Sequence, residues 1–125
     1  MAVYNGQHFI EQQLDSICSQ KNQDWNLYIR DDASCDASLS IVENFAKENS
    51  RVDIIENLEG NLGAKKSFVS LLESKQLEPY SYVAFSDQDD VWAQDKLLRQ
   101  SEEMYKLEGA FPNTPLLVYS DMEVV

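Results

Sequence analysis

The sequence predicts an α/β fold in which a mostly parallel sheet is flanked by helices, and three observations support this prediction. Strand-like and helix-like apolar patterns alternate along the chain, as in chains built from strand–helix–strand units. Short polar segments rich in Asp, Asn and Gly follow the expected strands. A chain of 125 residues with 43% hydrophobic residues is also long enough to bury one core.

The first elements follow from the spacing of apolar residues. Short apolar runs predict strands at "AVY" near the start, at "WNLYIR" (Trp25–Arg30) and at "VDII" (52–55). Apolar residues at helical spacing predict helices over about 7–19, 37–49 and 64–75. In the loop "DDASCDAS", Ser34 or Asp36 is expected to cap the second of these helices.

The later part of the chain continues the alternation. The segment "YSYVAFS" (80–86) has an unbroken apolar centre, which is typical of a strand buried on both faces. A helix is expected from Asp95 to Gly109, and "LLVYSD" (116–121) predicts a further strand. Residues 1–125 are expected to form a single domain, and its abrupt ends close to strands suggest a fragment of a longer, truncated domain.

Four polar segments follow four of the expected strands in turn. They are "YNG", "DDAS", "NLGAKK" and "DQDD". Because helices connect the strands, the strands run parallel and their carboxyl ends meet at one edge of the sheet. Ligands of open α/β sheets bind at that edge. We therefore expect these four segments to form a ligand site together.

The charge of the chain limits its partners. A net charge of −12 argues against binding to a nucleic-acid backbone, which needs a basic surface, and against electrostatic docking on anionic lipid. A cation, or a ligand that brings one, is the better match. The chain has no apolar run long enough to span a bilayer. Cys18 and Cys35 form no CxxC motif and are expected to be free thiols in a reducing cytoplasm.

The stretch "FSDQDDVW" places three carboxylates within four positions. Mg²⁺ or Mn²⁺ is held by one or two carboxylates plus phosphate oxygens and water, and Asp87 and Asp89 can point to one side of an extended turn. Asp90 would then face the backbone amides of the next turn. The alternative is that these acids only cap a helix start, and spacing by itself favours that alternative.

The pair Asp31-Asp32 ends an expected strand. A carboxylate there can accept the imide N–H of a pyrimidine base, and the alternative is a capped loop without a ligand. Tyr4, at the end of the first strand, can stack on a base or can belong to the core.

The segment "NLGAKK" combines a glycine with two lysines at a helix start. Gly63 lets the backbone turn sharply or approach a ligand closely. Lys65 and Lys66 are unfavourable against the helix dipole unless a diphosphate lies nearby, and simple solvation of both lysines is the alternative.

Four segments together resemble one known family: "MAVYNGQHFIEQQLDSICSQ", "YIRDDASCDASLSIVENF", "NLGAKKSF" and "VAFSDQDDVWAQDKL". They resemble the N-terminal, nucleotide-sugar-binding half of a family 2 glycosyltransferase with the Rossmann-like GT-A fold. The motifs cover nearly all of the chain in one order, which is more specific than any single motif. The "DQDD-x-W" variant looks most like rhamnosyltransferase-type members that build bacterial surface polysaccharide.

The resemblance implies nucleotide-binding roles at matching positions. These positions are Ala2 and Tyr4 at the base pocket, Asp31 and Asp32 on the pyrimidine and ribose, Gly63 and Lys66 beside the diphosphate, and Asp87 near the ribose.

The segment Asp87-Gln88-Asp89 matches the DXD motif of the family. The resemblance implies that Asp89 binds the Mg²⁺ or Mn²⁺ ion directly and that Asp87 supports it through ribose or water. Asp90 is expected to be structural and to cap the following helix.

The implied reaction transfers a sugar from a dTDP- or UDP-linked donor to an acceptor hydroxyl, with inversion, in the synthesis of bacterial surface polysaccharide. The acceptor is a saccharide or lipid-linked saccharide. The catalytic base is expected beyond Val125, so this chain alone should be inactive or nearly so. The resemblance implies a cytoplasmic protein, and for the full-length protein it allows a place at the inner face of the membrane.

Two other functions stay open on the sequence. The chain can be a non-catalytic nucleotide- or metal-binding α/β module, or an acidic interaction domain whose loop acids serve only as caps. The first strand is also shorter than the family's, which leaves backbone groups beside it unpaired. Self-association through these truncated edges is a plausible consequence.

Overall fold

The computed structural model describes residues 1–121 of the chain and places a three-stranded parallel sheet at its centre. The strands are β1 (Ala2–Val3), β2 (Leu27–Asp31) and β3 (Val52–Ile54), and they lie in the order β1-β2-β3. Ala2 lies opposite Arg30, and Leu27 lies opposite Val52. The predicted α/β class with a parallel sheet is therefore confirmed.

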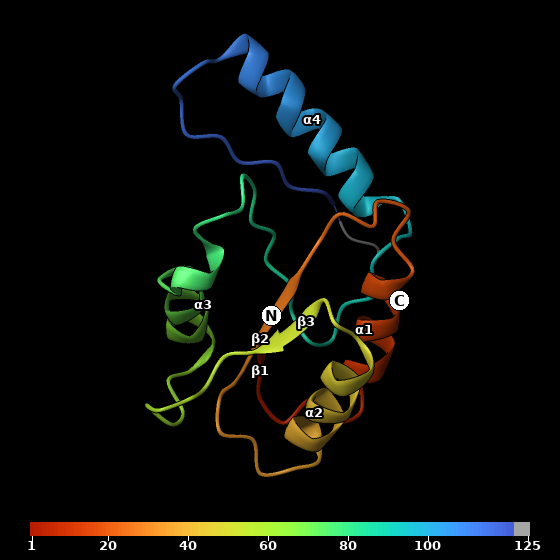
Figure 1. Ribbon diagram of the computed structural model, residues 1–125, viewed down its shortest axis with the longest axis vertical. Helices are drawn as coiled ribbons and strands as arrows, with labels where there is room; N and C mark the ends of the chain where they lie inside the picture. The colour runs from red at the N-terminus through yellow and green to blue at the C-terminus, as the bar shows by residue number, and fades with distance from the viewer. Residues whose placement is uncertain (122–125) are drawn as a thin grey trace.

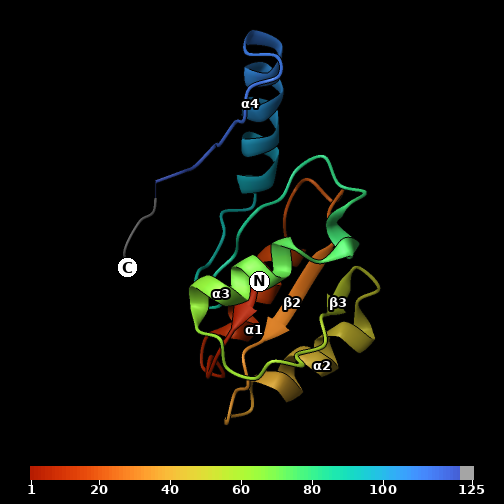
Figure 2. The same cartoon turned by 90° about the vertical axis from the view of Figure 1, so that its left-hand side faces the viewer.

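Helices cover both faces of this sheet. They are α1 (Ile10–Cys18), α2 (Ser38–Glu48), α3 (Ala64–Leu72) and α4 (Lys96–Ala110), with a short 3₁₀ helix η1 at Lys75–Leu77. Figures 1 and 2 show α1 and α2 on one face of the sheet and α3 on the other. Helix α4 packs against the core only at its start, where Leu97 is partly buried, and the rest of it extends away from these layers. None of the helices within residues 1–121 is long and apolar enough to cross a membrane.

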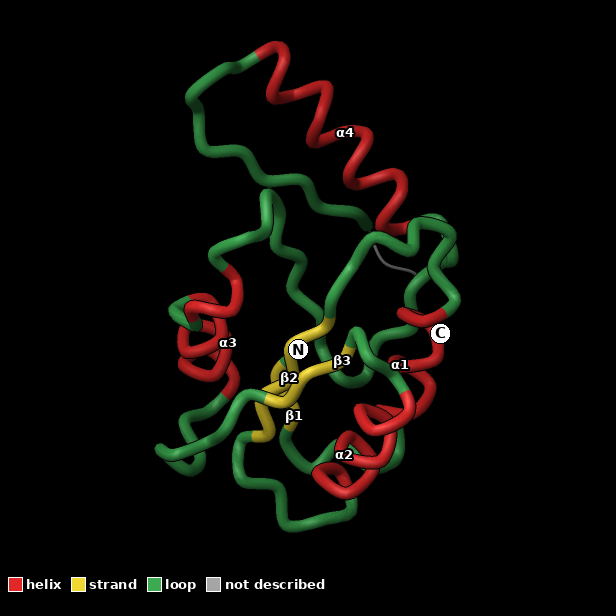
Figure 3. Tube along the Cα trace, viewed as in Figure 1, coloured by secondary structure: helices red, strands yellow, loops and turns green. Residues whose placement is uncertain are grey.

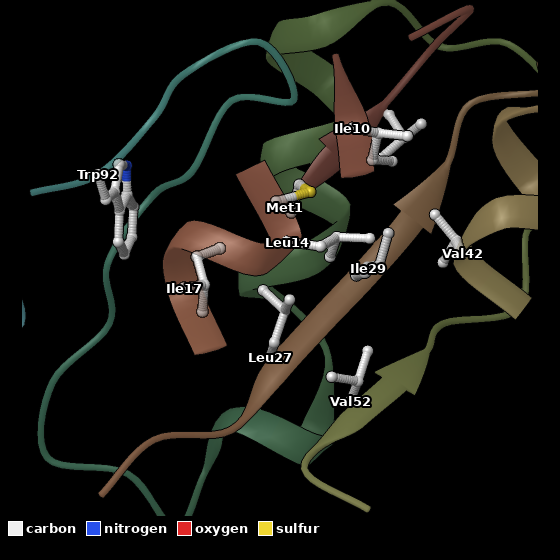
Figure 4. Packing of buried hydrophobic residues seen from close by; sticks show 10 residues of the cluster. Met1, Ile10, Leu14, Ile17, Leu27, Ile29, Val42, Val52 and Trp92 are labelled. Atoms are coloured by element: carbon white, nitrogen blue, oxygen red, sulfur yellow. The ribbon is translucent and has the colours of Figure 1, made fainter. Parts of the chain in front are cut away.

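The core lies between α1, α2 and the sheet. Ile10, Leu14 and Ile17 recur at helical spacing on α1, and all three side chains are buried. Figure 4 shows them facing the side chains of β2. Buried partners complete the cluster: Met1, Val3, Leu27, Ile29, Val42, Val52 and Trp92. This cluster fixes the positions of the loops that leave the strands.

Two expected strands do not form within the described residues. The segments 80–86 and 116–121 make no strand pairing, and Figure 3 shows loop at both places. The expected burial of 80–86 is also wrong, because Val83 is 48% exposed and Phe85 is 54% exposed. The free edge of β1 is only two residues long, so it offers few backbone groups to a neighbour. Side chains hold 80–86 instead, through the Phe68–Phe85 ring contact and the Tyr28–Tyr80 hydroxyl pair.

Smaller differences concern where the elements begin and end. Helix α1 begins at Ile10 rather than at 7, and α3 ends at Leu72 rather than at 75. Asp90 was expected to cap the last helix, and this expectation is wrong because α4 begins only at Lys96. The residue before that helix is Asp95, whose carboxylate pairs with Arg99 one turn later.

Candidate functional site at the carboxyl edge of the sheet

The turn after β1 is bound to the loop after β2 through backbone N–H groups. The Asn5 N–H donates to Ser34 Oγ at 3.0 Å, and the Gly6 N–H donates to Ser38 Oγ at 2.7 Å. The Asn5 side chain accepts in return from the Cys35 N–H at 2.8 Å. Asn5 has a φ of 48°, a left-handed conformation that asparagine tolerates better than most residues. The "YNG" and "DDAS" segments therefore meet as predicted.

Asp36 supports the same junction from the start of α2. Its Oδ1 accepts from the Ser38 N–H at 2.9 Å and its Oδ2 accepts from the Gln7 N–H at 3.1 Å. Desolvation acts to raise its pKa, but the hydrogen bonds outweigh that effect and lower the pKa of Asp36. Of the two expected caps, Asp36 therefore satisfies the first amide of α2, although the N-cap position itself is Ala37.

Asp31 ends β2 and is buried. Its Oδ2 accepts from the Ser34 N–H at 2.9 Å, and its Oδ1 accepts from Ser34 Oγ at 2.6 Å. Its backbone carbonyl accepts from Asn57 Nδ2 at 2.7 Å. The carboxylate thus shapes the loop after β2 while it lies beside the turn that follows β1.

Asp32 and Arg30 form a buried ion pair beside the glycine loop, residues 55–63 between β3 and α3. Arg30 is 1% exposed and Asp32 is 2% exposed. The Asp32 carboxylate also accepts from the Leu62 N–H at 2.8 Å and from the Gly63 N–H at 2.7 Å. Desolvation acts to raise its pKa, but these N–H groups and the Arg30 guanidinium outweigh it and lower the pKa of Asp32. In this geometry Asp32 anchors the glycine loop, and its contact with a nucleotide stays a prediction.

Arg30 joins β2 to residues on either side of the third polar segment. Its guanidinium donates to Ser67 Oγ at 2.8 Å, to Asn57 Oδ1 at 2.9 Å and to the Gly60 carbonyl at 3.0 Å. A guanidinium suits this place because it carries several donors in a fixed plane. A buried arginine was not expected from the sequence, and the adjacent aspartates were its only visible signal.

Gly63 and Lys66 lie at the exposed start of α3. Gly63 has a φ of 77°, which a residue with a side chain rarely adopts, and a Cβ there would meet nothing within 4 Å. Its carbonyl accepts the Ser67 N–H at 3.0 Å as α3 begins. Lys65 and Lys66 lie in the first turn of that helix, as predicted, and both are exposed.

The acidic loop, residues 86–92, reaches the end of β1 through Gln88. Gln88 Oε1 accepts from the Tyr4 N–H at 2.8 Å, and Gln88 Nε2 donates to the Tyr4 carbonyl at 3.0 Å. Asp87 and Asp89, on either side of Gln88, are exposed at this edge. Partial desolvation, followed by the charges of Asp90 and Asp89, raises the pKa of Asp87. A bound cation would reduce the repulsion between carboxylates this close together.

A polar row on α1 holds the chain on both sides of the acidic loop. With its carboxamide oxygen turned toward the loop, Gln13 accepts from Ser86 Oγ at 2.7 Å and from Trp92 Nε1 at 3.2 Å. Ser16 Oγ accepts from the Trp92 backbone N–H at 3.0 Å. Trp92 is 7% exposed and lies in the core cluster, so it fixes the loop to the body of the fold.

Gln20 continues this row toward α4. Its Nε2 donates to the Ala93 carbonyl at 2.8 Å, and its Oε1 accepts from the Leu97 N–H at 3.0 Å. This row was not expected from the sequence. Gln13 falls at helical spacing with Ile10 and Ile17, on the apolar face of α1, and that position was a signal that could have found it.

The carboxylates of the acidic loop suit a hard divalent cation. Mg²⁺ and Mn²⁺ prefer carboxylate, phosphate and water oxygens, and Asp87 and Asp89 offer the first of these. Within residues 1–121, no three His, Cys, Asp or Glu side chains gather into a group that could hold a metal ion by themselves. An ion here would therefore complete its coordination with oxygens of a ligand and of water.

The sequence-predicted site residues lie along the carboxyl edge, with different exposure. Tyr4 is 47% exposed, while Ala2 is half-buried within β1. Asp31 and Asp32 are buried beneath the loops. Besides Tyr4, the exposed members are Gly63, Lys66, Asp87 and Asp89.

A family model described as "Glycosyl transferase family 2" matches residues 1–121. The chain belongs to glycosyl transferase family 2. The resemblance seen in the sequence segments is thereby confirmed at the level of the family. The match spans all four polar segments of the carboxyl edge.

Individual relatives of this family are similar over most of the chain. The dTDP-rhamnosyl transferase RfbG of Shigella flexneri is 44% identical over 98 residues, which cover 78% of this chain and 34% of that protein. An Escherichia coli relative named UDP-Glc:alpha-D-GlcNAc-diphosphoundecaprenol beta-1,3-glucosyltransferase WfgD is 28% identical, over 100% of this chain and 45% of its own length. The chain thus spans between about a third and about a half of these family 2 relatives.

A solved structure shows the same fold. The crystal structure of S. aureus TarS 1-349 in complex with UDP superposes with a TM-score of 0.67 at 25% identity. The superposition covers 84% of this chain and 30% of that one. The GT-A-type α/β architecture expected for a family 2 member is therefore confirmed.

Proposed function

We propose that the chain is the donor-binding part of a glycosyltransferase that acts in bacterial surface polysaccharide synthesis. It transfers a sugar from a dTDP- or UDP-linked donor to the hydroxyl of a saccharide or lipid-linked saccharide, with inversion. The family match over residues 1–121 carries this proposal. The rhamnosyl transferase among the relatives and the UDP complex of TarS support a nucleoside-diphosphate sugar as the donor.

The nucleotide is proposed to lie across the carboxyl edge of the sheet. Tyr4 offers an exposed aromatic face for the base at the end of β1, and Ala2, half-buried within β1, is the second residue proposed for the base pocket. Asp31 offers its carboxylate at the end of β2 for the pyrimidine and ribose, and Asp32 lies next to it. The hydrogen bonds from Asn5 to Ser34 and from Ser34 to Asp31 connect the end of β1 with the end of β2.

The diphosphate is proposed to lie between the glycine loop and the acidic loop. Lys66 is exposed in the first turn of α3, where the free N–H groups of the helix favour an anion. Gly63 keeps the backbone beside it free of a side chain.

The acidic loop is proposed to hold Mg²⁺ or Mn²⁺. Asp89 is the proposed direct ligand, and Asp87 supports the ion and lies near the ribose. When bound, the ion neutralises charge that develops on the leaving diphosphate. The chain's own part is to keep both carboxylates at the edge where the nucleotide binds.

The catalytic base is not assigned to any of these residues. A carboxylate base is needed to take the acceptor proton, and we place it in sequence beyond Val125. We accordingly expect no sugar transfer by the 125 residues alone, measured as release of UDP or dTDP from the sugar nucleotide in the presence of acceptor. We place the protein in the cytoplasm, at the inner face of the membrane when full-length.

Calorimetry with UDP and with dTDP, in Mn²⁺ and in EDTA, tests the donor site. We expect binding of at least one nucleotide that Mn²⁺ strengthens, and loss of that strengthening in Asp89→Ala. Asp24→Ala is the matched control, because Asp24 is an exposed carboxylate that precedes β2 at the opposite edge of the sheet. No binding of either nucleotide by the unaltered chain contradicts the proposal.

Self-association through the free edges also stays a prediction. Sedimentation velocity over a tenfold concentration range would show it as a rising sedimentation coefficient. A constant monomer value would exclude it.

A further inference from the structure

The side chain of Gln88 occupies the place of a strand neighbour at the end of β1. Its carboxamide presents one acceptor and one donor, and both meet the backbone of Tyr4, at 2.8 Å and 3.0 Å. A paired strand offers the same combination through its own C=O and N–H groups. Tyr4 lies immediately after the last residue of β1, so this contact extends the hydrogen bonding of a very short strand.

Gly6 makes room for this contact. A Cβ built on Gly6 would lie 2.4 Å from Gln88 Oε1 and 2.5 Å from Gln88 Cδ. Gly6 itself is held by its N–H donation to Ser38 Oγ. A side chain at position 6 would therefore push the Gln88 carboxamide away from Tyr4 and leave the acidic residues themselves unchanged.

Gln88 lies between the two carboxylates assigned to the metal, and Tyr4 is the residue assigned to the base. Two backbone hydrogen bonds from one planar group fix both the distance and the orientation between these parts. The rest of the acidic loop is anchored elsewhere, at Ser86 and Trp92 on the α1 side.

We propose that Gln88 is a positioning residue that couples metal binding at Asp87 and Asp89 to nucleotide binding at Tyr4. This inference rests on the proposed function of the site. Both hydrogen bonds are solvent-exposed, so they contribute little to the stability of the whole fold. Their effect is local: they hold the two binding segments in one arrangement, so that each ligand finds the other half of its site already in place.

The test compares Gln88→Met and Gly6→Ala in the 125-residue chain. Gln88→Met keeps the length of the side chain and removes both hydrogen-bonding groups, while Gly6→Ala displaces the carboxamide from the opposite side. The first measurement is the ratio of UDP or dTDP affinity in Mn²⁺ to that in EDTA. We expect each variant to lose about tenfold of this ratio, and the double variant to lose no more than either single variant, because both act on one contact.

Amide hydrogen exchange at Tyr4 is the second measurement, and it needs no ligand. We expect exchange of the Tyr4 N–H to become about tenfold faster in Gln88→Met, with an unchanged urea midpoint. Gln94→Met is the matched control, since Gln94 is exposed in the segment before α4 and its backbone carbonyl, which the substitution keeps, accepts from the Lys21 N–H.

The outcomes separate the inference from the proposed function. If the unaltered chain binds neither nucleotide, the proposed function fails and the coupling role fails with it. If the unaltered chain shows Mn²⁺-strengthened binding that Gln88→Met and Gly6→Ala retain in full, the inference alone is overturned. Unchanged Tyr4 exchange in Gln88→Met also overturns it, because the contact would then be absent in solution.

Discussion

Asp32→Asn should strongly destabilise the fold, because it removes the negative charge from a buried ion pair. Arg30 and Asp32 are 1% and 2% exposed, so the guanidinium left behind has no access to bulk water. Removing one partner of a buried pair costs about 3–5 kcal/mol. Asparagine keeps one acceptor for the Leu62 or Gly63 N–H, and Arg30 keeps its bonds to Ser67 and Gly60, so we expect the lower end, about 3 kcal/mol.

Urea unfolding followed by circular dichroism measures this loss. With a slope of about 1–3 kcal/mol/M, a loss of about 3 kcal/mol lowers the midpoint by about 1–3 M. Asp53→Asn is the matched control, because Asp53 is exposed on β3 and should change stability by less than about 0.5 kcal/mol. Equal midpoints for the two variants would refute the assignment of a buried, paired Asp32.

The pH dependence of unfolding provides an independent check on the same pair. The pKa of Asp32 in the folded chain lies below its ordinary value of 3.8. The unfolded state therefore binds this proton more readily, so the stabilisation is fully present above the ordinary pKa and is lost as pH falls through the folded value. Asp32→Asn should flatten the acid limb of the stability curve, and an identical acid limb in both proteins would contradict the argument.

Three further predictions concern backbone strain and the polar row of α1. Ala33 has a φ of 63°, a left-handed conformation that is strained for alanine but not for glycine. Ala33→Gly should therefore raise the free energy of unfolding, measured in urea, by about 0.5–1 kcal/mol. The control Ala46→Gly, inside α2, should lower it by about 1 kcal/mol. Gly63→Ala should lower it by about 1–2 kcal/mol through strain alone, since its φ is 77° and the space around it is open; an unchanged midpoint would argue against a left-handed Gly63. Gln20→Ala should lower the free energy of unfolding by about 1–3 kcal/mol and speed amide exchange at Leu97. The control Gln12→Ala, on the exposed face of α1, should change neither quantity. Equal effects of the two substitutions would contradict the buried contacts of Gln20.

The spacing of apolar residues was sufficient to predict a helix that buries one of its own faces. Ile10, Leu14 and Ile17 predict α1 because their spacing places them on one side of a helix, whatever lies opposite. The same reasoning placed the first three polar segments after β1, β2 and β3, whereas the fourth, "DQDD", follows a loop and not the expected strand. It failed for 80–86, whose apolar composition allows a strand but cannot supply a neighbour with a long enough edge.

The sequence by itself determined the α/β class, the parallel sheet and the family, and it predicted the acidic loop as a cation site. Only the tertiary structure decided which of the polar residues bear on one another. It assigned Asp32 to Arg30 and the glycine loop, Gln13 and Gln20 to the loop before α4, and Gln88 to Tyr4. Hydrogen bonds between residues far apart in the chain depend on distance and orientation in three dimensions, and residue spacing carries neither.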